Sequence, residues 1–114
     1  MLQGSSGLGE FETLLLLAIL HLSEQKVDAN GSAIRDEIQT RAGRHVPRGS
    51  VYITLDRLEA KGLLHSREIG GVAARGHRPK RIFKVTADGV GAVRAAVSAV
   101  TKMQRGLQDV LGRV

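Results

Sequence analysis

The chain has 114 residues and a mass of 12.2 kDa, with 42% hydrophobic and 25% charged side chains. This is the composition of one globular domain rather than of a disordered tail. There is no cysteine, which excludes disulfides and thiolate zinc sites. The longest wholly apolar run, residues 14–20, is far shorter than the roughly 20 residues of a bilayer span. No membrane-spanning segment is therefore expected.

The positive charge is concentrated in one part of the chain. Residues 35–84 hold 12 basic and 5 acidic side chains, whereas the remainder holds 5 basic and 6 acidic ones. Within that part, residues 70–84 carry five basic side chains and no acidic one. A cluster of one sign on a folded domain indicates a polyanionic partner, most often nucleic acid. The alternative is a basic face that serves solubility alone.

Residues 1–7 are small and polar and predict a flexible N-terminal arm. Apolar residues then recur at helical spacing and predict a first helix over residues 8–24. Leu16, Leu17 and Leu20 widen its apolar stripe until the middle of the helix is hydrophobic nearly all round. Because one small domain is not expected to cover both sides of such a helix, a second subunit is predicted to cover one of them.

Two more helices are expected before the chain changes to a strand pattern. Asp28 is the expected N-cap of a helix over residues 29–42, which ends at Gly43. The next helix is predicted over residues 47–61, because proline suits a first helical turn and a glycine follows. Its predicted buried stripe consists of Val51, Leu55 and Leu58.

The rest of the chain predicts a hairpin and a last helix. Alternating residues at 63–69 and 80–86 predict two strands, joined by a basic loop that contains glycine. Thr86 is the expected cap of a helix that runs to about Leu111. The fold class is thus mainly α with a small β hairpin (α+β), in the order of a winged helix-turn-helix. Residues 8–86 would form the DNA-binding domain and residues 87–114 a long C-terminal dimerisation helix.

The free face of the third helix is predicted to read DNA. This face is small or short near its N-terminal end, which suits a helix that presses into a major groove about 12 Å wide. The alternative for Tyr52 is a structural role, with a half-buried ring whose hydroxyl contacts the second helix. The alternative for Ser50 is a hydrogen bond to the backbone near the start of the helix. Asp56 would pair with a base or orient an arginine. The predicted contacts are Arg48, Gly49, Ser50, Tyr52, Ile53 and Arg57.

The hairpin loop is predicted to be a wing that enters the minor groove, where the strong negative potential attracts arginine and lysine. The alternative is a mobile basic loop that makes no specific contact. The residues predicted to contact DNA are Arg75, His77, Arg78, Lys80 and Arg81.

The last helix carries a heptad seam, which predicts a dimerisation arm. Gln104 interrupts the seam and would fix the register between two copies. A helix folded back on its own domain is the alternative. With Leu16, Leu17 and Leu20, the predicted dimer contacts are Val93, Val97, Val100, Gln104, Leu107 and Leu111.

The sequence contains no recognisable catalytic motif. The four histidines are scattered and none has metal-ligand spacing from another histidine or a carboxylate. No glycine-rich phosphate loop and no nucleophile elbow is present. We therefore expect neither an enzyme nor a metal or cofactor site.

Three motifs resemble the PadR family of bacterial transcriptional regulators, in its short form. They are Leu-Gly-Glu-Phe-Glu at 8–12, Gly-Ser-Val-Tyr-Ile-Thr-Leu-Asp-Arg-Leu-Glu-Ala-Lys-Gly-Leu at 49–63 and Arg-Pro-Lys-Arg-Ile-Phe-Lys-Val-Thr-Ala-Asp-Gly at 78–89. The resemblance implies a homodimeric repressor in the bacterial cytoplasm, associated with the nucleoid and bound to double-stranded DNA. It places Ser50 and Tyr52 at contact positions of the helix, and Arg78 and Lys80 at those of the wing.

Two functions remain open at this point. The first is a sequence-specific regulator that binds a palindromic operator as a homodimer. The second is a winged-helix module that binds a protein or RNA without operator specificity. A small-molecule effector is also left open, because the chain lacks the extra C-terminal helices of larger relatives and has no tryptophan to line a pocket.

Overall fold

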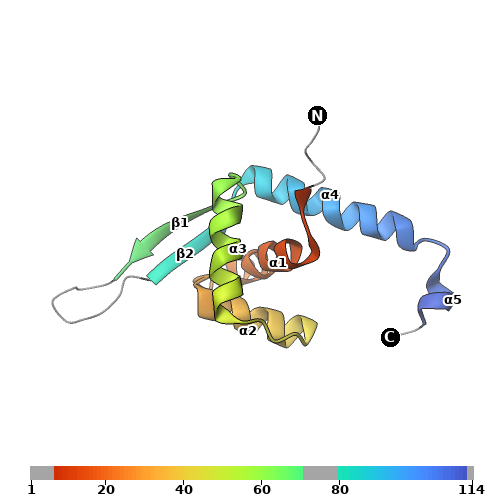
Figure 1. The fold of residues 1–114 in the computed structure, drawn as a ribbon, viewed down its shortest axis with the longest axis horizontal. Coiled ribbons are helices and arrows are strands. Elements are labelled where there is room, and N and C mark those ends of the chain that lie inside the picture. Colours follow the sequence, from red (N-terminus) through yellow and green to blue (C-terminus); the bar gives the residue numbers. More distant parts are fainter. Residues whose placement is uncertain (1–6, 71–79, 113–114) are drawn as a thin grey trace.

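The computed structural model describes residues 7–70 and 80–112 (Figure 1). The predicted order of three helices, a hairpin and a C-terminal helix is confirmed. The elements are α1 (Glu10–Glu24), α2 (Gly31–Ala42), α3 (Arg48–Ala60), β1 (Leu64–Ile69), β2 (Lys80–Val85), α4 (Ala87–Gln104) and α5 (Gln108–Leu111).

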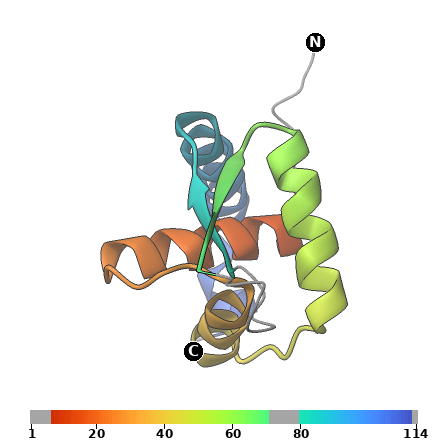
Figure 2. The ribbon, with the colours of Figure 1, turned by 90° about the vertical axis from the view of Figure 1, so that its left-hand side faces the viewer.

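Helix α1 lies at the centre of the core, where it contacts α2, α3, α4 and β2 (Figure 2). Leu15, Leu16 and Ile19 have no exposed surface at all. Elements of the same chain therefore cover the face of α1 that carries these three residues. A second subunit on the other face of the helix stays a prediction. Leu16 in particular is enclosed by its own domain and cannot contact a partner. Leu17 and Leu20 are half-buried.

Helices α2 and α3 form the helix-turn-helix. The N-cap of α2 is Asn30 rather than the predicted Asp28, because the Asn30 side chain accepts a hydrogen bond of 2.8 Å from the backbone N–H of Ala33. Gly43 ends the helix, as predicted, with a left-handed φ of 66°. In the turn, Arg35 Nε donates to the carbonyl of Val46 at 3.1 Å, which ties α2 to the start of α3.

Strands β1 and β2 pair antiparallel, with Leu64 opposite Val85 and Ile69 opposite Lys80. Phe83 points into the core, and its backbone N–H donates to the carbonyl of Ala29 at 2.9 Å. This bond attaches the free edge of β2 to the segment before α2. The hairpin is thereby fixed to the helical body at its base.

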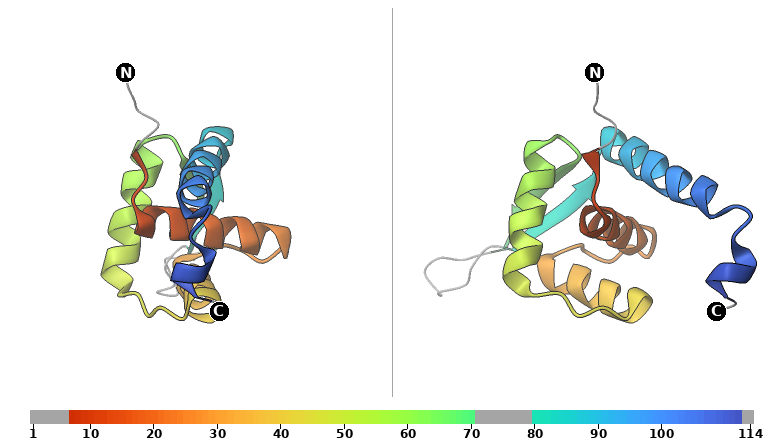
Figure 3. Two further views of the ribbon diagram at one scale, coloured as in Figure 1. Left: turned by 90° about the vertical axis from the view of Figure 1, so that its right-hand side faces the viewer. Right: turned by 45° about the vertical axis from the view of Figure 1, so that its right-hand side comes forward.

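The C-terminal helix is shorter than predicted. Helix α4 begins after the Thr86 cap and ends at Gln104, and Gly106 then adopts a φ of 86° that no regular helix contains. One turn, α5, follows (Figure 3). The continuous helix predicted to about Leu111 is therefore wrong, and Leu107 and Leu111 belong to a separate turn. Val93 is buried in its own domain, so its predicted contact with a partner is corrected as well.

Glu12 links the start of α1 to the end of α3. One carboxylate oxygen accepts from the backbone N–H of Gly9 at 3.1 Å, and the other lies 3.0 Å from Lys61 Nζ. Burial alone would raise the pKa of Glu12, but the Gly9 N–H, Lys61 and the charge of Arg57 outweigh it, so the pKa is lowered from 4.5.

We expect Glu12→Gln to lower the free energy of unfolding by about 1–2 kcal/mol at pH 7, because a buried charge-assisted network loses its anion. A carboxyl with a lowered folded-state pKa stabilises the fold above its unfolded pKa and ceases to do so as pH falls through the folded one. The difference between variant and wild type should therefore shrink below about pH 4.5 in urea titrations. Glu10→Gln is the matched control, since Glu10 pairs with Arg44 in the open and should change stability less. An equal effect of both changes would contradict the role of Glu12.

Candidate nucleic-acid interface

Helix α3 exposes a face without bulk at its N-terminal end. Val51, Leu55 and Leu58 are fully buried, as predicted, so Gly49, Ser50 and Ile53 point outward. No heavy atom outside the helix lies within 4 Å of the position that a Cβ of Gly49 would take, and Ile53 is 62% exposed. The backbone of the first two turns can thus approach a surface closely, with one apolar side chain leading.

The predicted basic contacts of α3 are both on the surface but differ in their surroundings. Arg48 is exposed at the first residue of the helix, and no ion pair joins it to another residue of the ranges 7–70 and 80–112. Arg57 is exposed two and a half turns later, close enough to Glu12 for its charge to lower that carboxyl's pKa. Of these two arginines, Arg48 therefore has fewer competing contacts in the described part of the chain.

Tyr52 occupies the alternative position considered from the sequence. Its ring is half-buried, and a Cβ added to Gly31 would lie only 2.3 Å from its hydroxyl oxygen. The ring therefore packs on the first turn of α2, where only glycine leaves room for it. Tyr52 helps to set how α2 and α3 pack together, and its contact with a base stays a prediction.

The predicted wing residues separate into three groups. Arg75, His77 and Arg78 lie outside the described residues. Lys80 is exposed at the start of β2. Arg81 is partly buried, and its guanidinium is engaged by two carboxylates of α3, which corrects its predicted role as a free cation at the minor groove.

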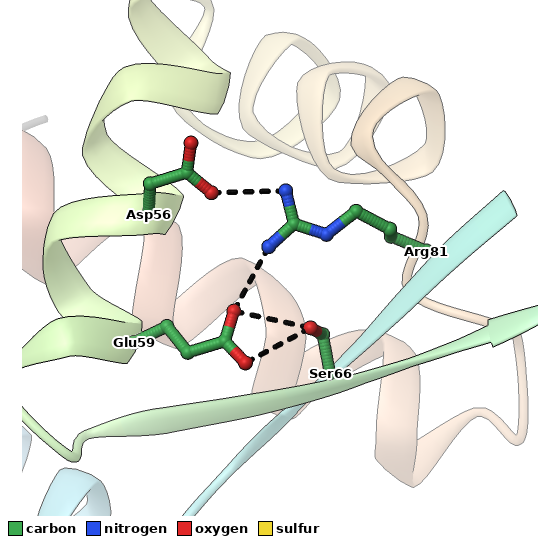
Figure 4. Close-up of polar contacts among 4 residues, drawn as sticks. All are labelled: Asp56, Glu59, Ser66 and Arg81. Carbon is green, nitrogen blue, oxygen red and sulfur yellow. Dashed lines mark hydrogen bonds and ion pairs between the residues drawn. The ribbon is translucent and has the colours of Figure 1, made fainter.

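Arg81 connects the hairpin to α3 (Figure 4). Its Nη1 lies 2.9 Å from Asp56 Oδ1 and its Nη2 lies 2.9 Å from Glu59 Oε1, while Ser66 Oγ donates to Glu59 at 3.0 Å. The guanidinium also lies 4.8 Å from the centre of the Phe83 ring. Asp56 was expected either to pair with a base or to orient an arginine, and the structure shows it paired with Arg81.

The charges around Arg81 reinforce its protonated state. Partial burial by itself lowers the pKa of Arg81, but the hydrogen bonds and charges of Asp56 and Glu59 more than compensate, and the pKa is raised. Two carboxylates therefore share one guanidinium at the junction of helix and hairpin. Sequence reasoning missed Glu59 and Ser66, although the spacing of Asp56 and Glu59, one helical turn apart, could have indicated a paired acceptor.

A second basic surface covers the opposite face of the hairpin. His65, Arg67 and Lys84 are exposed there, with His65 directly opposite Lys84 in the register. These residues were not among the predicted contacts. The period-2 alternation of the strand places them on one face and could have identified them.

Helix α4 leaves an apolar surface open. A groove of about 680 Å³ lies between α4 and the start of α1, lined in part by Leu8, Leu14, Val97 and Val100. Six of the eight large hydrophobic side chains that residues 7–70 and 80–112 expose lie on α4, α5 or the turn between them. They are Val97, Val100, Met103, Leu107, Val110 and Leu111.

Within the described ranges, no group of three His, Cys, Asp or Glu side chains is placed to hold a metal ion. No helix in that part of the chain has both the length and the hydropathy to cross a membrane.

Solved structures of similar fold exist in bacteria and archaea. A PadR family transcriptional regulator from Eggerthella lenta superposes with a TM-score of 0.62 at 23% identity, covering 86% of this chain and 83% of that one. A PadR family regulator from Clostridium difficile gives 0.67 at 20% identity over 90% and 99%. RosR of H. salinarum gives 0.67 at 23% identity over 93% and 86%. No curated protein sequence is significantly similar to the chain.

The sequence itself matches a family profile. Residues 18–95, which include α2, α3, both strands and the first half of α4, match the transcriptional regulator PadR-like family. The match covers more than half of the chain, and it includes the exposed face of α3 and the Arg81 junction described above. The chain therefore belongs to the PadR-like family of transcriptional regulators.

Proposed function

We propose that the protein is a sequence-specific double-stranded DNA-binding regulator of transcription, a repressor that acts in the bacterial cytoplasm on a palindromic operator. The observation that carries this proposal is the exposed edge of α3, where Gly49, Ser50 and Ile53 lie beside an Arg48 that has no ion pair within the described residues. A helix edge of this kind fits a major groove, whereas a basic surface without it would favour only non-specific binding.

In the proposed complex, α3 is the recognition helix and the β1–β2 hairpin is the wing. Ser50 offers a hydroxyl to a base edge or phosphate, and Ile53 offers an apolar contact to a thymine methyl group. Arg48 and Arg57 reach phosphate or guanine. Lys80, at the point where the wing leaves the described residues, would contact the backbone beside the minor groove, together with the loop residues Arg75, His77 and Arg78.

We propose a second copy of the chain as the occupant of the apolar surface on α4. Val97 and Val100 are 42% and 57% exposed beside the groove against α1, and isolated apolar patches of this kind mark interfaces between proteins. The described part of α4 extends beyond the helical body (Figure 3), so a partner can reach it. Leu17 and Leu20 of α1, with Gln104, Leu107 and Leu111, are the further candidates for this contact.

Binding to DNA is tested by selecting the preferred sequence from a library of random duplexes and measuring Kd over a series of salt concentrations. We expect Arg48→Ala to weaken binding to every duplex and to reduce the slope of log K against log salt by about one unit, because one phosphate contact is lost.

Ile53→Ala is expected to act differently. It should leave the salt slope unchanged and reduce discrimination at one base pair by about five- to tenfold, since an apolar base contact is lost. Val27→Ala is the matched control, because Val27 is a large exposed hydrophobic residue outside α3. If wild type binds single-stranded RNA as tightly as any selected duplex, the proposed function is wrong and the RNA-binding alternative is supported.

A further inference from the structure

We propose that Arg81 is a positioning residue, which holds the wing at a fixed angle to the recognition helix. Its guanidinium pairs with Asp56 and Glu59 rather than with DNA. The inference rests on the proposed function and assigns a role in specificity to residues that make no base contact. It concerns the described base of the wing and not the loop at its tip.

Two carboxylates of α3 hold the Arg81 guanidinium, and we call this arrangement of Asp56, Glu59 and Arg81 the clamp. Asp56 and Glu59 lie one turn apart on α3 and each accepts from a different terminal nitrogen of the same guanidinium, both at 2.9 Å. A planar guanidinium that is held at two nitrogens cannot rotate without losing one partner. The strand that carries Arg81 is thereby fixed against the helix that carries the carboxylates.

The clamp is supported from both strands. Ser66 of β1 donates to Glu59 with both contacts at 3.0 Å, and Phe83 of β2 lies under the guanidinium. Ser66 and Phe83 are also opposite each other in the strand register. Both strands of the hairpin therefore hold the same carboxylate–guanidinium cluster, which makes the cluster the link between the wing and α3.

The clamp also masks negative charge on the proposed DNA-binding side. Asp56 is a single helical turn from Ile53, and its side chain is 62% exposed, so its carboxylate would face phosphates when α3 is in a groove. Repulsion between this carboxylate and the phosphates would oppose binding. Pairing with Arg81 offsets part of the negative charge of the two carboxylates and keeps Asp56 turned toward the hairpin. Arg81 thus favours binding in two ways. It reduces the repulsion between α3 and DNA, and it fixes the position of the wing relative to α3.

The test compares the specificity ratio, defined as Kd for a random duplex divided by Kd for the selected duplex. Arg81→Lys keeps the positive charge but replaces the two-nitrogen fork by a single ammonium. We expect it to lower the ratio at least fivefold while the salt slope stays unchanged. Asp56→Ala removes one negative charge and leaves Arg81 held by Glu59 alone, so we expect tighter binding to random duplex, a steeper salt slope and a lower ratio.

Arg67→Ala is the matched control. Arg67 is an exposed arginine on the opposite face of the same hairpin, and no ion pair of it is seen within the described residues. Its loss should leave the specificity ratio within twofold of wild type. Circular dichroism melts of all variants separate a loss of fold from a loss of positioning, and Arg81→Lys preserves charge and bulk so that folding is retained.

Two results would overturn the inference while leaving the proposed function intact. The first is an Arg81→Lys variant that keeps the full specificity ratio, which would show that charge alone is needed. The second is an Asp56→Ala variant that binds random and selected duplexes with wild-type affinities, which would show that the pairing of Asp56 with Arg81 does not affect binding. A wild-type protein with no preferred duplex would instead refute the proposed function, and the inference with it.

Discussion

Replacing Gly89 by alanine is expected to destabilise the domain by about 3 kcal/mol or more, a drop in Tm on the order of 10–20 °C. A Cβ at this position would lie 2.2 Å from the backbone carbonyl oxygen of Leu63 and 2.6 Å from Val85 Cγ1. The carbonyl is part of the junction between α3 and the hairpin, where it also accepts from the Thr86 N–H at 3.0 Å. Neither the strand nor the first turn of α4 can yield without breaking that junction.

Gly91 provides a control in the same helix. It is exposed, no heavy atom outside the helix lies within 4 Å of its Cβ position, and its backbone is helical. Gly91→Ala should therefore stabilise the protein by about 0.5–1 kcal/mol through the gain in helix propensity. Thermal and urea unfolding of the two variants should move in opposite directions. A Gly89→Ala protein as stable as wild type would contradict the close contact between α4 and Leu63.

The sequence predicted helix α3 and the hairpin well because local signals agree there. Pro47 is the N-cap of α3, directly before its first turn, and the spacing of Val51, Leu55 and Leu58 determines the buried face of the helix. The two strands are bounded by glycine at 62 and 70 and by proline at 79, and these boundaries predicted their positions although their burial alternates only weakly. Where propensity, periodicity and boundary residues coincide, tertiary packing has little to change.

The core position of α1 was not predictable from its own residues. A helix that is hydrophobic all round is either in the middle of a domain or shared between subunits, and periodicity does not distinguish the two. Contacts with α4 and β2, both distant in sequence, place Leu15, Leu16 and Ile19 in the core, whereas Leu17 and Leu20 stay half-buried. Likewise, the heptad spacing of the last helix continues past Gly106, although the backbone there does not remain helical.

The roles of Tyr52 and Arg81 depend on partners far along the chain. The space for the Tyr52 ring comes from Gly31 in another helix, and the partners of Arg81 are 22 and 25 residues away. Residue type and charge marked both as candidates for DNA contact. Only the fold shows that the Tyr52 ring packs against Gly31 and that the Arg81 guanidinium pairs with two carboxylates of α3.

The double variant Val97→Asp, Val100→Asp is expected to convert the proposed dimer to a monomer. These two side chains are 42% and 57% exposed on α4, and in a symmetric dimer they would bring four carboxylates into one apolar contact. Burying unpaired charge costs several kcal/mol, so we expect association to weaken at least about a hundredfold. Sedimentation should show a species of 12.2 kDa in place of one of twice that mass.

The DNA-binding consequence separates dimerisation from recognition. A monomer should bind a duplex with one half-site about as tightly as wild type does, yet lose about a hundredfold in affinity for the full palindrome, because the second half-site no longer adds its contacts. Val27→Asp is the control, since it places the same charge on an exposed valine outside α4. If the double variant still sediments as a dimer, then the partner binds elsewhere on the molecule. The apolar surface of α4 would then not be the dimer contact.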